Sequence, residues 1–182
     1  GYPNLNDDDW LWGGNLKEIE YTIIHGTRQP GGKDTHTSLM PAFGRDQMLT
    51  DGQISAVADH VLSLSGRAKP NATGAQIFAD NCAACHGADG KGDRQFGAPN
   101  LADAIWLYGG SKAQVVQQIS NARLGVMPAW GGRLDPVTIK MLAAYVHSLG
   151  GGEAFAATAA APGETAAAQA GAVPQEAGDV RP

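Results

Sequence analysis

The stretch that decides the fold is Cys82-Ala83-Ala84-Cys85-His86, which holds both cysteines of the 182-residue chain. Cys-x-x-Cys-His is the attachment signature of c-type haem. Its spacing places two thiols about one helical turn apart, where each can add to one haem vinyl group. The following residue then points its imidazole at the iron. We therefore predict one covalent haem c, attached to Cys82 and Cys85, with His86 as an iron ligand.

Two other kinds of site use closely spaced cysteines. A thioredoxin-like redox pair is expected after a strand in a βαβ context, and the sequence shows no alternating strand pattern before Cys82. A zinc site needs further ligands, and no third cysteine is present. The haem reading is therefore favoured over both.

A low-spin electron carrier needs a sixth iron ligand, for which Met127 is the candidate. It lies 41 residues after His86, in the loop Val126-Met127-Pro128-Ala129-Trp130. Methionine and histidine together raise the potential of a haem iron. Most single methionines only fill core space, but the nearby haem motif favours a ligand role. We predict Met127 as the second iron ligand of this haem.

An internal repeat runs through most of the sequence. PNLNDDDWLWGG at 3–14 matches PNLADAIWLYGG at 99–110 at eight of twelve positions, and MPAFG at 40–44 matches MPAWG at 127–131. Leu49, Ile54, Val61 and Leu64 match positions 85 residues further on. Such self-similarity indicates two related units. Met40 is then expected to ligate the iron of a first haem whose histidine-bearing motif lies upstream of Gly1.

The predicted organisation is all-α, with two tandem domains and a tail. We expect residues 1–66 to be the C-terminal part of a first domain and residues 67–152 to be a complete second domain. Residues 153–182 are rich in Ala, Gly, Pro and Glu and predict a disordered tail. Without its own first helix, the first domain should leave Ile54, Val57 and Val61 exposed, and residues 1–66 are not expected to fold stably alone.

Three helices can be placed from their caps and apolar spacing. One follows the capping-box pair Thr50 and Gln53 and carries the apolar side chains Ile54, Val57, Val61 and Leu62. A second spans about 73–82 and faces Ile77 and Phe78 inward. The third begins with Asp135 as cap and Pro136 in its first turn. Its expected inward side chains are Ile139, Leu142, Tyr145, Val146 and Leu149.

The composition argues against some classes of function. The net charge is −5, which argues against a nucleic-acid partner. Residues 1–66 carry 4 basic against 9 acidic side chains, and residues 67–152 carry 8 against 5. No run of 18 apolar residues is present, so no membrane span is predicted within this sequence.

The paired motifs of residues 1–152 together resemble the dihaem subunit III of cbb3-type cytochrome c oxidases. The resemblance implies two class I cytochrome c domains, truncated here before the first haem-attachment motif, with two haems in the parent protein. It further implies that the Pro99 carbonyl orients His86. Gly74, Phe78 and Tyr145 match positions where the first and last helices of cytochromes c cross.

The resemblance also implies a biological setting. A donor cytochrome c would deliver electrons, and the haems would pass them to the other subunits of the oxidase. Oxygen reduction would occur in another subunit, so this chain is not expected to be an enzyme by itself. It would lie on the periplasmic side of the bacterial inner membrane, anchored by a segment absent from this sequence. The alternatives are a soluble dihaem shuttle of the cytochrome c4 type and a haem enzyme such as a peroxidase, which would need an open iron position.

Overall fold

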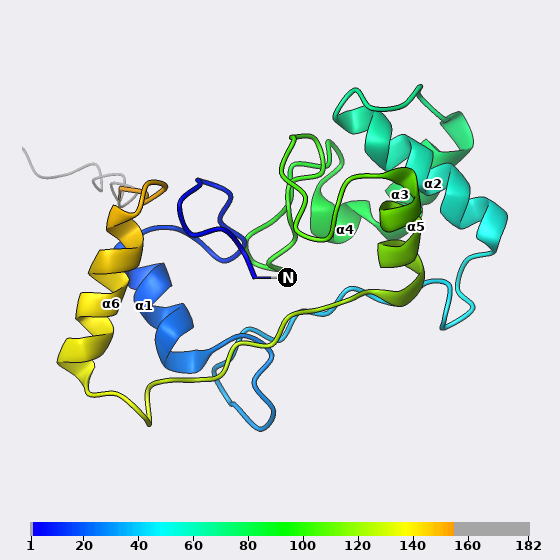
Figure 1. Ribbon diagram of the computed structural model, residues 1–182. Coiled ribbons are helices and arrows are strands. Elements are labelled where there is room, and N and C mark those ends of the chain that lie inside the picture. Colours follow the sequence, from blue (N-terminus) through cyan, green and yellow to red (C-terminus); the bar gives the residue numbers. More distant parts are fainter. Residues whose placement is uncertain (1, 155–182) are drawn as a thin grey trace, which may run out of the picture.

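A computed structural model describes residues 2–154, which form helices and long connecting segments (Figure 1). The helices are α1 (Leu16–His25), α2 (Asp51–Leu64), α3 (Ala72–Asn81), α4 (Ala83–His86), α5 (Lys112–Asn121) and α6 (Pro136–Ser148). Residues 2–154 contain isolated β-bridges and no strand. The expectation of a helical chain is confirmed over this part. The expected tail from residue 155 onward lies outside the described residues.

The helix caps confirm the boundaries predicted from sequence. Thr50 and Gln53 form the capping box of α2, in which Gln53 N–H donates to Thr50 Oγ1 and Thr50 N–H donates to Gln53 Oε1. Asp135 accepts from the backbone of the first turn of α6, and Pro136 occupies the position where its missing N–H costs nothing. Sequence reasoning missed α1 and α5, which begin at the capping boxes of Asn15 and Ser111.

The helices pack in two groups, and each group combines both repeats. In one group α2 packs against α3 and α5, and α4 follows α3 directly; in the other, α1 packs against α6 (Figure 1). The last helix of repeat one therefore lies with the first helices of repeat two. The last helix of repeat two lies with α1 of repeat one. The groups cut across the boundary predicted between residues 66 and 67.

This pairing corrects the expectation for α2. Ile54, Val57 and Val61 are among the most buried side chains of the protein, not exposed ones. They join Ile77 and Phe78 of α3 in one apolar cluster. The reason is that α3 covers the face of α2 that repeat one alone could not cover. Burying apolar area of this kind is the main stabilising contribution to a fold of this size.

The prediction for α6 is correct in part. Ile139 is buried and Val146 partly buried, both facing α1, but Leu142 and Tyr145 are exposed. Tyr145, with 62% of its surface accessible, therefore does not lie at a crossing with α3. Leu142 and Tyr145 correspond in the repeat to Val57 and His60 of α2, and α2 is the helix that packs on α3. The reason is that α2, the last helix of repeat one, occupies the place on α3 expected for α6, and α6 packs on α1.

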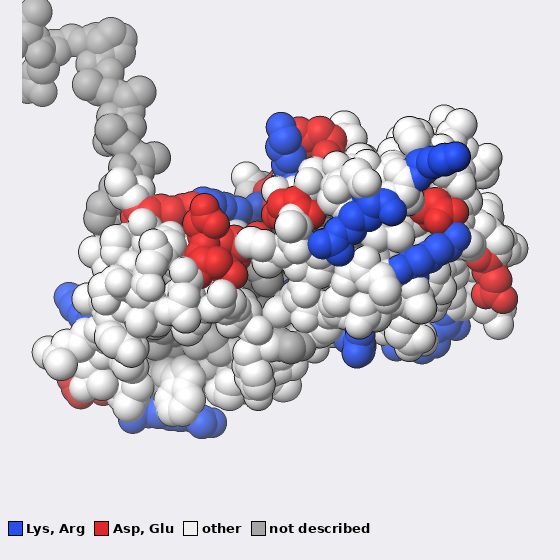
Figure 2. All heavy atoms as spheres, turned by 45° about the horizontal axis from the view of Figure 1, so that its top comes forward, with Lys and Arg blue, Asp and Glu red and all other residues white. Residues whose placement is uncertain are grey.

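Two segments connect the groups and run side by side, from α1 to α2 and from α5 to α6 (Figure 1). Thr27 N–H donates to the Met127 carbonyl at 2.9 Å, and Met127 N–H donates to the Thr27 carbonyl at 2.9 Å. Within residues 2–154 no helix has the length and apolar character needed to cross a bilayer. On the face drawn in Figure 2, acidic and basic side chains are interspersed.

Candidate haem site

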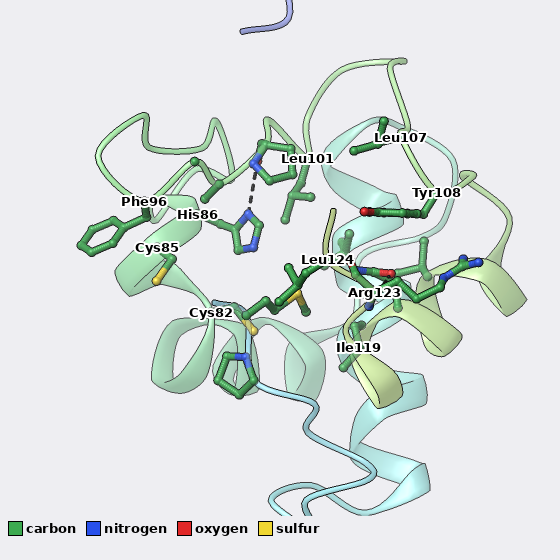
Figure 3. Close-up of a pocket in the computed structure, with 18 of the residues that line it drawn as sticks. Cys82, Cys85, His86, Phe96, Leu101, Leu107, Tyr108, Ile119, Arg123 and Leu124 are labelled. Atoms are coloured by element: carbon green, nitrogen blue, oxygen red, sulfur yellow. Dashed lines mark hydrogen bonds between the residues drawn. The ribbon is translucent and has the colours of Figure 1, made fainter. Parts of the chain in front are cut away.

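The haem-attachment motif lies at the junction of α3 and α4, on the wall of an apolar pocket (Figure 3). Cys82 ends α3, and Cys85 and His86 form the end of the one-turn α4. All three side chains line the pocket. Gly87, with φ of +77°, ends the turn in a conformation that suits glycine. The motif is therefore held by a short helix whose last residue aims its ring into the cavity.

His86 is oriented by a hydrogen bond to the backbone. Its Nδ1 lies 3.2 Å from the Pro99 carbonyl oxygen, which can only accept, so Nδ1 carries the proton. The other ring nitrogen, Nε2, is then unprotonated and available to an iron ion. Burial lowers the pKa of His86, and the bond to Pro99 opposes this in part. A neutral imidazole with its free nitrogen in the pocket is the form that binds iron.

A tight loop presents the Pro99 carbonyl. Gly92 N–H donates to the His86 carbonyl at 2.8 Å, and Leu101 N–H donates to the Gly90 carbonyl at 2.7 Å. Gly92 has φ of +84°, and a Cβ there would overlap the carbonyl of Ala98. The glycine at this position is therefore required for the loop to pass close to residues 98–100. The contact between Pro99 and His86 that the family resemblance implied is present.

The Cys82 thiol is in the protonated form before any attachment reaction. Burial, with a smaller contribution from Cys85, raises the pKa of the Cys82 thiol to about 11. The two cysteines are free and partly buried. A thiol that adds across a vinyl double bond forms a thioether and loses this ionisation altogether, so burial beside a bound haem has no continuing electrostatic cost for them.

The pocket wall opposite the motif is mostly apolar, with a few polar groups at its edge. Tyr108 and Arg123 lie on that side, and Leu124 lies between them and the ring of His86 (Figure 3). The indole N–H of Trp106 is buried and has no hydrogen-bond partner among the described residues. Arg67 and Arg123 lie over the rings of Trp106 and Tyr108, at 5.6 and 5.1 Å from the ring centroids. An unpaired buried donor beside arginine fits an anionic acceptor.

These features fit a haem. The apolar walls match the porphyrin ring, the two thiols and the imidazole come from one side, and the unpaired Trp106 N–H suits a propionate carboxylate. Sequence reasoning missed Trp106, Tyr108 and Arg123 as site residues. The first two belong to the repeated block at 99–110, so the repeat carried a signal, but only the folded chain shows which way they face.

The two candidate methionines are not where the repeat order places them. Met40 lines the pocket that holds Cys82, Cys85 and His86, together with its neighbour Pro41. Met127 lies in the other helical group and packs against the cluster of Ile19, Ile23, Ile139 and Ala143. The structure thus brings Met40 into the site with His86 and does not bring Met127 there. Met40, expected to serve a first haem, therefore lies beside His86 for the same reason that α2 is buried: the halves of the repeats are exchanged.

Comparison with known proteins agrees with this site. Residues 69–146 match the family described as cytochrome c oxidase, cbb3-type, subunit III. This region belongs to that family. The chain is 55% identical over 157 residues to the cbb3-type cytochrome c oxidase subunit FixP of Bradyrhizobium sp. strain ORS 278. It is 55% identical over 156 residues to subunit CcoP of Cereibacter sphaeroides, and 57% identical over 157 residues to FixP of Azorhizobium caulinodans.

The alignments extend beyond the haem-attachment motif. Each covers 84% of this chain and 54%, 54% and 53% of the three relatives, in that order, so the chain spans about half the length of the curated relatives it matches. Both repeats therefore contribute to the similarity. The similarity thus associates the chain with cytochrome c, haem and cbb3-type oxidases.

Proposed function

We propose that this chain is the haem-bearing part of an electron-transfer subunit of a cbb3-type cytochrome c oxidase. It would accept electrons from a donor cytochrome c and pass them toward the other subunits, with oxygen reduced in another subunit. The site would lie on the periplasmic side of the bacterial inner membrane. The observation that carries the proposal is the convergence of Cys82, Cys85, His86 and Met40 on one apolar pocket.

Each side chain has a distinct task in this proposal. Cys82 and Cys85 attach the cofactor covalently, and His86 binds the iron through Nε2. The Pro99 carbonyl fixes the ring and increases the electron density on the ligating nitrogen. A bound haem supplies the one-electron couple of its iron. The apolar walls exclude water, which reduces the rearrangement of solvent that accompanies a change of charge.

A methionine sulfur as the sixth ligand would close the iron to oxygen and other small molecules. Such a site can exchange electrons but cannot bind a substrate at the metal, which is why an electron-transfer role is favoured over a peroxidase-like reaction. The thioether also favours ferrous iron and so raises the potential. The parent protein would carry two such haems, in tandem cytochrome c domains, with one attached to this chain.

The purified chain, produced with a haem-attachment system, tests the proposal. Haem is quantified per polypeptide after acid extraction, and oxidised and reduced spectra are recorded. The proposal predicts one haem that resists extraction, low-spin spectra in both states, reversible one-electron reduction and no rapid binding of carbon monoxide. The C82S/C85S double variant should lose its haem on extraction. Extractable haem in the parent chain, or high-spin iron that binds carbon monoxide, would contradict the proposal.

A further inference from the structure

The loop that runs from His86 to Pro99 contains a tight hairpin, residues 93–98. Asp93 N–H donates to the Ala98 carbonyl at 3.2 Å, and Ala98 N–H donates to the Asp93 carbonyl at 3.0 Å. Pro99 follows the hairpin directly, and its carbonyl is the group that orients His86. A displacement of the hairpin would therefore move this carbonyl.

Arg94, in the turn of this hairpin, binds a carboxylate from the segment that follows α6. Its Nη1 donates to Glu153 Oε2 at 2.7 Å, and its Nη2 donates to Glu153 Oε1. A two-point contact between arginine and a carboxylate is stronger and more directional than a single hydrogen bond. Because α6 packs against α1, the pair joins the hairpin of the haem site to the other helical group.

Glu153 is held in turn by the block of repeat one that precedes α1. Its backbone N–H donates to the Gly14 carbonyl at 2.9 Å, and Gly14 N–H donates to its Oε2 at 3.1 Å. Trp10 adds a third bond, from its Nε1 to the Gly151 carbonyl at 2.6 Å. The carboxylate that receives Arg94 is therefore fixed in position by several bonds to repeat one.

Arg94 also serves as the cation for other carboxylates at this junction. The hydrogen bonds to Glu153 raise the pKa of Arg94; burial opposes this, and the charges of Glu18 and Asp9 reinforce it. The side chains of Arg94 and Glu153 are 50% and 30% exposed. A single ion pair at such exposure contributes little, but a bidentate pair within a network of charges contributes more. Loss of Arg94 would leave these carboxylates without their shared cation.

A second contact places the hairpin against repeat one. Gly97 lies against the indole of Trp12, so closely that a Cβ on Gly97 would overlap the ring. Trp12 is itself stacked on His36, with ring centroids 4.1 Å apart. The hairpin thus meets repeat one at two points, at Gly97 and, through the carboxylate, at Arg94. Two such points restrict both its position and its tilt.

We propose that Arg94 is a positioning residue: bound to Glu153, it holds the hairpin that places the Pro99 carbonyl against the iron ligand. The proposal rests on the function proposed above and adds to it a link between the ring of His86 and the other helical group. A change in how the two groups pack would reach the ring through this link. The reduction potential of the haem on repeat two then depends on a contact made with repeat one.

The double variant R94A/E153Q tests the proposal in the haem-loaded chain. It removes the ion pair without changing the net charge, and the glutamine oxygen can still accept from Gly14. One readout is the exchange of the His86 Nδ1 proton with solvent, followed by NMR in the reduced state. Exchange should be faster by about tenfold, as expected for loss of a charge-assisted hydrogen bond.

The second readout is the reduction potential, which should rise because a less firmly held imidazole is a poorer donor to iron. Parental exchange of the Nδ1 proton, or a potential that does not rise, would overturn the role of Arg94 and leave the proposed function intact. A parent chain without covalent haem would instead contradict the proposed function.

The ion pair of Lys91 and Asp89 provides a matched control. It lies in the same loop, and its two exposed side chains are joined to each other at 3.1 Å. K91A/D89N also keeps the net charge and should leave both readouts at their parental values. If R94A/E153Q does not retain the fold, as judged by circular dichroism, E153Q is the milder variant, because Arg94 still faces Glu18 and Asp9. E153Q should then shift both readouts in the same directions by less, and parental values would overturn the proposal.

Discussion

Gly74 of α3 lies directly against the backbone carbonyl of Ala56 in α2, so closely that a Cβ on Gly74 would overlap it. This contact joins the haem-attachment helix of repeat two to the last helix of repeat one. It sets how closely the two helices approach, and hence how well Ile77 and Phe78 are buried between them. The absence of a side chain at position 74 is thus a condition for the shared core.

The first prediction follows from this contact. G74A should lower the free energy of unfolding by about 1–3 kcal/mol, the usual cost of overpacking a filled core. Chemical denaturation of the haem-loaded chain, followed by circular dichroism, measures the change. G52A is the matched control, because a Cβ on Gly52 in the first turn of α2 meets nothing within 4 Å. It should leave stability unchanged or raise it by up to about 1 kcal/mol. Equal effects of the two variants would show that the contact is not as described.

The second prediction concerns the carbonyl that orients His86. G92A introduces a Cβ into the Ala98 carbonyl and an unfavourable φ, and so displaces residues 98–100. Weakening the bond from His86 Nδ1 to Pro99 makes the imidazole a poorer donor, which destabilises ferric iron. The reduction potential should therefore rise. G132A, at an open position, should leave the potential unchanged. A lower potential in G92A would contradict the role assigned to Pro99.

The third prediction concerns the unpaired indole N–H of Trp106. If it donates to a haem carboxylate, W106F should destabilise the haem-loaded chain by about 1.5–3 kcal/mol, the worth of a hydrogen bond to a charged group. It should also change the pH dependence of the reduction potential, because the propionate loses a donor. W130F, in the other helical group, should leave that pH dependence intact. An unaltered profile in W106F would exclude the bond.

The fourth prediction concerns pH and His36. Its ring stacks on Trp12 at 4.1 Å between centroids, and Nε2 lies 3.1 Å from Thr22 Oγ1. Burial first, and then Arg28 and His25, lower the pKa of His36 below its ordinary value of 6.5. The unfolded chain therefore binds the proton more readily, so this group's contribution to stability is present at pH 7 and is lost as the pH falls below about 6.5.

Denaturation of the parent chain and of H36Q at several pH values between 7 and 5 measures this contribution. The parent should lose stability over this range more steeply than H36Q, whose glutamine does not titrate. His60 and His86, whose pKa values burial also lowers, remain in both proteins and contribute to the residual slope. Parallel profiles for the two proteins would show that His36 titrates as it does in the unfolded chain.

Local features of the fold could be predicted from the sequence because they depend on nearby residues. The cap at Asp135, the capping box at Thr50, and the inward faces of Ile77 and Phe78 are all short-range signals. The Cys-x-x-Cys-His spacing likewise identifies its chemistry without the fold. Such local patterns predict which residues form a helix or bind a cofactor, and they do not depend on which helices pack together.

Which helices pack against each other could not be predicted, because the two repeats are too similar in sequence. The apolar face of α2 packs on α3, and α6 carries apolar residues at most of the matching positions, so the sequence pattern permits either pairing. The observed pairing is accompanied by the crossing at Gly26, Thr27 and Met127, a contact between segments about 100 residues apart that no local signal reports. The order of motifs along the chain predicts Met127 as the partner of His86, but order along the chain does not determine which residues lie close together when repeats exchange their halves.

Methionine ligation in this pocket is tested by an NMR spectrum of the reduced, haem-loaded chain with its four methionine methyl groups labelled with carbon-13. The ring current of a haem shifts the methyl resonance of an axial methionine far upfield of all other methionine methyl signals, and M40L and M127L assign that signal. The position of Met40 beside His86 predicts one such resonance, absent in M40L and present in M127L. A signal that disappears in M127L and persists in M40L would contradict the exchange, and the absence of any upfield methyl signal would contradict methionine ligation altogether.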